Sequence, residues 1–262
     1  MNSLSYFLSS TKNETVKLKR TFAFWLSVIG AFFIPLIYLL YYLLKYEKLI
    51  PKEGENPWDS FMTSQITAAS PLLIPMFIIL VTSLIVQIEH KSLSVKHLFT
   101  LPIPKWSVYF GKLFIVLGLV LFTYVLFALL VFIVGYTVGG VHGELQMWEH
   151  TPNVSLFVKL LFRSFISVLG IIGLQFWLSF RFKNFIVPLG IGMVLFITGL
   201  IVYQAKESIY YPYAYSMLSL FPLDSKDVNA MVWFPRVALY SIGYFLLFSV
   251  LGFLDIRRMN IK

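Results

Sequence analysis

The sequence predicts an all-α membrane protein with six transmembrane helices, and two observations carry this prediction. The chain contains six long apolar stretches, and a helix needs about 20 apolar residues to cross the ~30 Å hydrocarbon core of a bilayer. Positive charge also gathers on every second connection between them. A helix of a soluble core would interleave a polar face, and these stretches do not. The stretches are 21–44, 66–88, 113–138, 156–180, 185–203 and 237–254.

The charges on the connections predict the orientation. The two ends of the chain and the connections 89–112 and 181–184 together hold 13 Lys and Arg against three acidic residues. The other three connections hold five Lys against nine acidic residues. Because connections rich in Lys and Arg stay in the cytoplasm, we expect a multi-pass protein of the inner (cytoplasmic) membrane with both termini cytoplasmic. The basic balance is therefore a topology signal, and it argues against nucleic-acid binding.

The composition and the motifs argue against an enzyme. The chain has no cysteine, which excludes disulfides, thiolate catalysis and Cys-based metal sites. A phosphate-binding loop is absent, because Leu113 follows Gly111-Lys112 and Trp106 stands where the first glycine would be. GxSxG and HExxH motifs are also missing, and the apolar stretches contain no acidic residue. We expect no catalytic residue and no cofactor bound by this chain.

The N-terminal segment 1–20 is predicted to be an amphipathic elbow helix that lies on the inner membrane surface. Apolar residues such as Leu4 and Phe7 recur at helical spacing. Thr11 and Glu14 have the spacing of a capping box, in which each side chain accepts a hydrogen bond from the other's backbone N–H. The alternative is a frayed leader with helical propensity.

The connection 89–112 is the only sizeable loop on the predicted cytoplasmic side. The second helix can continue to Phe99, where a Pro-x-Pro element interrupts it, because residues before proline are pushed out of the α region. Pro104 can then begin the helix that leads into the third span. The apolar middle of the loop, rimmed by Lys and His, is typical of a protein contact. The alternative is an interfacial segment with Trp106 and Tyr109 in the aromatic belt, and both can hold.

The order of certain residues in this loop indicates a family. Glu89 ends the second predicted helix, Leu101-Pro102 follows, and Tyr109 and Lys112 open the third helix. This order resembles the cytoplasmic loop of type-2 permease subunits of ATP-binding-cassette (ABC) transporters. The aromatic segment 210–213 is similar to one in the small permeases of lantibiotic-immunity and bacitracin-type exporters.

The resemblance implies that the loop 89–112 contains a coupling helix, which docks into a separate ATPase subunit. It assigns this role to Glu89, Lys91, Leu98, Phe99, Leu101 and Pro102. It also implies two copies of the ATPase, which bind ATP and Mg, and a second permease that is either the same chain or a paralogue. Membrane lipids complete the expected partners.

Lys159 and Arg163 are the unusual charges, because they lie four residues apart on one face of the fourth stretch, near its outer end. Snorkelling to the outer headgroups is one interpretation, since it costs little near an interface. The other is a basic spot that binds an anionic lipid or a substrate entering from the outer leaflet.

Two outer connections have their own patterns. Two His and two Glu between residues 142 and 150 can bind zinc weakly, but neighbouring glycines loosen the segment, and we expect a solvated acidic loop without a metal. The aromatic connection 204–236 is predicted to form short helices that lie at the outer interface or dip into it. Among the spans, Pro71 and Pro75 are predicted to break the second one near its outer end.

These features together predict the membrane-spanning permease subunit of an ATP-driven exporter. The spans lack acidic residues and are rich in Phe, so a cavity between two copies would be apolar. Such a cavity suits an amphipathic or lipid-like substrate, such as a peptide antibiotic, a lipid or a drug. The alternative is a stand-alone secondary carrier or membrane assembly factor, although carriers usually need intramembrane acids or broken half-helices.

Overall fold

The computed structural model describes residues 18, 21–91, 105–221 and 234–258, and this part of the chain is helical without strands. The side chains of residues 89–91 are outside the description. The long helices are α2 (Phe22–Lys45), α3 (Pro57–Ala69), α4 (Leu73–Lys91), α6 (Lys105–Val141), α7 (Val154–Ser167), α8 (Leu169–Arg181), α9 (Ile186–Val202) and α12 (Arg236–Arg258). Short helices are η1 (Tyr46–Lys48), η2 (Gly143–Leu145), η3 (Lys206–Tyr210), η4 (Pro212–Ala214) and α10 (Tyr215–Leu218).

Four helical segments in the described part of the chain are long and apolar enough to cross a membrane. They are Phe22–Lys48, Lys105–Val141, Val154–Arg181 and Arg236–Arg258. A fifth is formed if α3 and α4 make one span, bent by 51° at a short break. The sequence prediction of an all-α membrane protein is therefore confirmed with four or five candidate spans. A sixth crossing by α9, which has 17 residues, remains a prediction.

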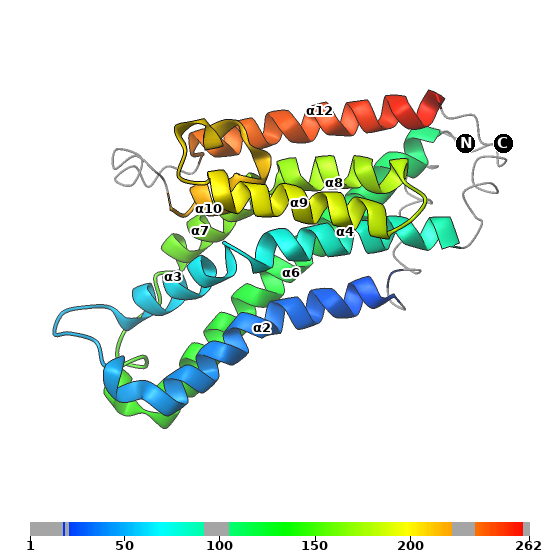
Figure 1. The fold of residues 1–262 in the computed structure, drawn as a ribbon. Coiled ribbons are helices and arrows are strands. Elements are labelled where there is room, and N and C mark those ends of the chain that lie inside the picture. Colours follow the sequence, from blue (N-terminus) through cyan, green and yellow to red (C-terminus); the bar gives the residue numbers. More distant parts are fainter. Residues whose placement is uncertain (1–17, 19–20, 92–104, 222–233, 259–262) are drawn as a thin grey trace.

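The long helices run roughly side by side, and their ends gather at the two ends of the molecule (Figure 1). One end holds the start of α2, the last turns of α4, α8 and α12, and the first turns of α6 and α9. The opposite end holds the connection from α2 to α3 and the short helices before α12. This alternation is the arrangement that the connection charges predict, with the basic connections at one end.

The second predicted span is broken where the sequence predicts. The break falls between Ala69 and Leu73, and it contains Pro71, which cannot donate a backbone hydrogen bond. The prediction is wrong for Pro75, which lies in the first turn of α4 without breaking it, because the N–H groups of a first turn have no partner within the helix. The predicted start at residue 66 is wrong, because helix α3 already begins at Pro57, with the Asn56 side chain accepting a hydrogen bond from Trp58 N at 3.0 Å. The first turns of α3 carry polar residues, so apolar counting misses them.

The fourth predicted span contains a break that the sequence does not predict. Helices α7 and α8 meet at Val168, which is buried, and there is no proline there. Ser241 of α12 bridges the break. Its Oγ donates to Ser167 O at 2.9 Å and accepts from Gly170 N at 2.9 Å. A side chain from another helix thus satisfies backbone groups that a helix interruption exposes.

The third connection is solvated at its acidic residues, as predicted, since Glu144 and Glu149 are exposed, but two of its apolar side chains pack into the protein. Leu145 and Met147 are buried, and the Trp58 indole N–H donates to Met147 O at 2.8 Å. Gly139 makes room for this contact, because a Cβ there would lie 2.4 Å from Met147 Cβ. The described residues hold no cluster of three or more His, Cys, Asp or Glu that fits a metal ion.

The described part of the connection 204–236 forms short helices, as the sequence predicts, but it packs inward. Tyr213, Ala214 and Tyr215 are buried. Tyr213 lies so close to α9 that a Cβ on Gly199 would be 3.0 Å from its backbone carbonyl carbon. The segment therefore packs closely against α9 through Tyr213 of η4.

Candidate functional site

The helix ends that flank the predicted coupling loop lie at the end of the molecule that holds the start of α2 and the last turn of α12. Helix α4 continues to Lys91, beyond the predicted span end at residue 88, and α6 begins at Lys105. Both observations agree with helices that extend past the membrane on either side of the loop. The predicted coupling residues Leu98, Phe99, Leu101 and Pro102 are outside the described residues, as are the side chains of Glu89 and Lys91. Their role stays a prediction.

Tyr109, a member of the loop motif, joins α6 to α8 and α12. Its ring is buried against Phe176 at 5.1 Å, Phe180 at 5.5 Å and Phe253 at 5.9 Å between centroids. Gly252 leaves space for the hydroxyl, because a Cβ there would lie within contact distance of Tyr109 Oη. A displacement of the first turn of α6 therefore acts directly on both partner helices.

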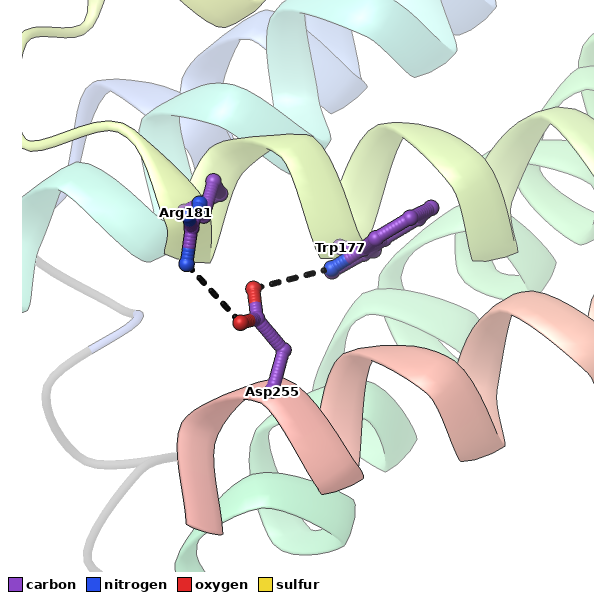
Figure 2. A network of polar contacts seen from close by, with 3 residues as sticks. All are labelled: Trp177, Arg181 and Asp255. Atoms are coloured by element: carbon purple, nitrogen blue, oxygen red, sulfur yellow. Dashed lines mark hydrogen bonds and ion pairs between the residues drawn. The ribbon is translucent and has the colours of Figure 1, made fainter. Parts of the chain in front are cut away.

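An ion pair joins the same ends of α8 and α12. Arg181 Nη1 donates to Asp255 Oδ1 at 2.8 Å, and Trp177 Nε1 donates to Asp255 Oδ2 at 3.3 Å (Figure 2). The Arg181 side chain is 52% exposed, so the pair contributes at most ~1 kcal/mol and serves mainly to fix the register of the two helices. Sequence reasoning missed this contact, since Arg181 and Asp255 lie on different connections.

A buried polar network lies deeper, where α4, α8 and α9 meet. Gln175 is fully buried, and its amide nitrogen donates to Ser83 Oγ at 3.0 Å and to Pro188 O at 2.8 Å. Its amide oxygen accepts from Tyr213 Oη at 3.1 Å. The Tyr213 hydroxyl is protonated at neutral pH and can donate, and desolvation by burial raises its pKa further above the ordinary value. All polar atoms of Gln175 are thus satisfied.

Gly192 allows the network to form, because a Cβ at this position would lie 2.6 Å from Gln175 Oε1. The glutamine within the apolar stretch 156–180 is a sequence signal for such a network, although its partners cannot be read from the chain.

Two cavities lie along α2. The apolar cavity, of about 230 Å³, is lined by α2, α3, α4 and α6. The polar cavity, of about 670 Å³, is lined by the outer half of α2, the connection 46–56, the start of α3 and Met147. The apolar cavity lies beside the break between α3 and α4, where the two helices are bent by 51°, since Ala69 and Leu73 on the two sides of the break both line it. Sequence analysis predicted neither.

Lys159 and Arg163 lie in the second and third turns of α7, as predicted, and both side chains are half-buried. Neither residue lines the apolar or the polar cavity. The choice between headgroup anchoring and substrate contact stays open.

A comparison with protein families identifies the chain. Residues 11–199 match a family model described as ABC-2 family transporter protein, which is more than half of the sequence. The chain belongs to the ABC-2 transporter family. The match includes the loop 89–112 and most of the predicted spans, and it confirms the resemblance to type-2 ABC permeases. No curated protein and no solved structure matches the chain.

This ABC-2 permease is therefore a membrane component of an ABC transporter, a class that works with an ABC ATPase. The helical structure agrees with that role, since four or five of its helical segments can cross a membrane. The finer likeness to lantibiotic-immunity and bacitracin-type permeases remains a hypothesis.

Proposed function

We propose that this ABC-2 permease is the membrane subunit of an ATP-driven exporter of an amphipathic or lipid-like molecule. Family membership carries the ABC assignment. The apolar cavity supports the substrate class, because a site for an ion or a sugar needs compensating polar groups. The bent pair of α3 and α4 is a broken span of the kind that secondary carriers use, but α2, α6 and α9 contain no acidic residue of the kind that ion coupling needs, and family membership favours the ABC assignment.

The power stroke is proposed to enter through the loop 89–112. Two copies of a separate ATPase subunit bind ATP and Mg, and each pushes on the coupling residues between α4 and α6. The packing of Tyr109 supports this route, since its ring contacts α8 and α12. The second permease is another copy of this chain or a paralogue.

Replacing Leu101 with Asp should separate the permease from its ATPase. A charged residue in an apolar socket is desolvated without a partner, which costs several kcal/mol. The ATPase should fail to co-purify after gentle extraction, or its activity should lose stimulation by the permease, while membrane insertion is normal.

Leu101→Met is the matched control, because it conserves volume and apolar character. If the ATPase still co-purifies with the Leu101→Asp variant and its activity is still stimulated, Leu101 is not a coupling residue. If the unmodified chain itself binds no ATPase, the result favours the alternative of a stand-alone secondary carrier or membrane assembly factor.

The cargo is proposed to be a membrane-active peptide antibiotic, a lipid or a hydrophobic drug, with Lys159 and Arg163 contacting it from the outer leaflet. Cells that express the chain with its ATPase should survive cationic antimicrobial peptides or bacitracin better than cells without it. Alanine at both positions should remove the protection at normal expression. Unchanged sensitivity to all these agents would exclude the immunity role, and protection that survives the double substitution would leave both residues as headgroup anchors.

A further inference from the structure

The two cavities follow one another along a single stripe of α2. Residues that recur every four positions line them in turn, and such residues form a ridge that is inclined to the helix axis and winds slowly around the helix. The stripe consists of Leu26, Gly30, Ile34, Tyr38 and Tyr42, of which the first three line the apolar cavity and the last two the polar cavity. About 6 Å, one helical turn, separates the two sets on the helix axis. On α3, Ser64 lines the polar cavity and Ile66 the apolar one.

The apolar cavity is suited to hydrocarbon rather than to water. The two hydroxyls that line it already have partners, since Thr123 Oγ1 donates to Leu119 O at 2.9 Å and Tyr124 Oη bonds Ser164 Oγ at 2.9 Å. A cavity without available polar groups stays dry, and one of ~150 Å³ already binds benzene. This cavity, at about 230 Å³, accommodates a longer hydrocarbon segment.

The apolar cavity also communicates with the surface that faces the bilayer. Ile29 and Phe33 line it on α2, and these side chains are 56% and 48% exposed. In a membrane, the medium that surrounds exposed apolar side chains on a spanning helix is the acyl chains of lipids. Hydrocarbon is thus available at the opening.

The polar cavity carries charges of both signs. Lys48 and Lys52 line it together with Glu55 and Asp59. Asp59 Oδ1 is shielded from solvent and has no hydrogen-bond partner among the described residues. A carboxylate oxygen accepts hydrogen bonds only, and an ammonium group is a strong donor to it, whereas lysines favour phosphate. The cavity therefore matches a head group that contains both a phosphate and an ammonium.

We propose that the α2–α3 seam binds one phospholipid with an ammonium head group. The head occupies the polar cavity, and one acyl chain enters the apolar cavity past Ile29 and Phe33. The site is contained in a single chain, and its polar cavity lies at the end of the molecule opposite the last turn of α4 and the first turn of α6. Its occupancy does not depend on the proposed export activity, so it is tested without the ATPase.

Native mass spectrometry of the delipidated full-length chain tests the head-group selectivity. Phosphatidylethanolamine should bind several-fold more tightly than phosphatidylglycerol, with one lipid per chain in the tight class. Asp59→Asn should remove this preference, because the neutral amide no longer attracts the ammonium. The control Glu53→Gln makes the same charge change in the same connection at a residue that lines neither cavity, and it should preserve the preference.

The acyl-chain site is tested by a matched pair of glycine substitutions. A Cβ on Gly30 would lie 3.3 Å from Phe77 Cδ2, so Gly30→Leu fills the apolar cavity and should weaken both lipids several-fold. A Cβ on Gly118 meets nothing within 4 Å, so Gly118→Leu should change neither.

A phosphatidylethanolamine with a photoreactive acyl chain gives a readout on the unmodified protein. Its label should map to 26–34, 66–80 and 123–127, the segments that line the apolar cavity. Equal binding of the two lipids, equal effects of Asp59→Asn and Glu53→Gln, or labelling confined to other helices would overturn the proposal. The labelling result stands even if Gly30→Leu fails to fold.

Discussion

Two buried glutamines of this permease differ in their hydrogen bonding, and we expect them to have opposite effects on stability. Gln175 and Gln65 are both fully buried. The amide of Gln175 has three partners from α4, α9 and η4, whereas both amide atoms of Gln65 lack a partner among the described residues. A satisfied buried amide stabilises a fold, and an unsatisfied one costs free energy.

Gln175→Leu should lower the free energy of unfolding by about 1–3 kcal/mol, because Tyr213 and Ser83 lose their partner. Gln65→Leu should leave the stability unchanged or raise it, since an apolar side chain of similar size replaces an unpaired amide. Thermal unfolding of both variants in one detergent measures the difference. A loss of similar size in both would show that Gln65 has a partner of its own.

The break between α3 and α4 is held by an element far away in the sequence. Ser216 Oγ of α10 donates to Ser70 O at 2.5 Å, and Ser70 Oγ donates to Ser216 O. Proline bends such a helix pair, and the reciprocal bonds fix its angle from outside. The break thus combines a bend at a proline with two hydrogen bonds between Ser70 and Ser216 that can open and close. This combination is expected at a point where a helix changes its angle.

A disulfide between Ser70→Cys and Ser216→Cys should lock this break. The chain has no other cysteine, so oxidation is specific to the pair. We expect oxidation to abolish permease-stimulated ATPase activity in the reconstituted complex and reductant to restore it, with each single variant under oxidant as the control. Full activity of the oxidised pair would mean that the break keeps its angle during the cycle.

At the scale of the whole molecule, the ends of the helices sort by charge. The first turns of α2, α6 and α9 and the last turns of α4, α8 and α12, which border the basic connections, share one end, and the described parts of the acidic connections share the other (Figure 1). With a bilayer between these two ends, the positive-inside rule predicts that the loop 89–112 lies in the cytoplasm, where an ATPase can reach it.

Cysteine labelling measures this orientation directly. An impermeant thiol reagent applied to intact cells should label Lys52→Cys and leave Asn260→Cys unmodified until the cells are opened. The unmodified chain is a clean background, because it contains no cysteine. The reverse pattern would invert the topology and place the loop 89–112 outside the cell, which is incompatible with coupling to ATP.

The sequence by itself determined the class of fold, most helix positions, the break at Pro71 and the family. Each of these features depends on a property of a short stretch of sequence. The spans depend on the summed transfer free energy of about 20 residues, the topology on the charge of a connection, and the helix break on the missing N–H of a proline. Because each property belongs to neighbouring residues in the sequence, these features can be predicted without knowing which distant residues are in contact.

Only the tertiary structure decided the break at Val168, the packed third connection, the partners of Gln175 and the two cavities. Ser241 lies 71 residues from Gly170, and Trp58 lies 89 residues from Met147, yet these contacts settle where a helix breaks and where a loop packs. The physical reason is that buried polar groups must find partners wherever the fold brings them. A cavity likewise belongs to no single segment, because it is the volume that four packed helices leave between them.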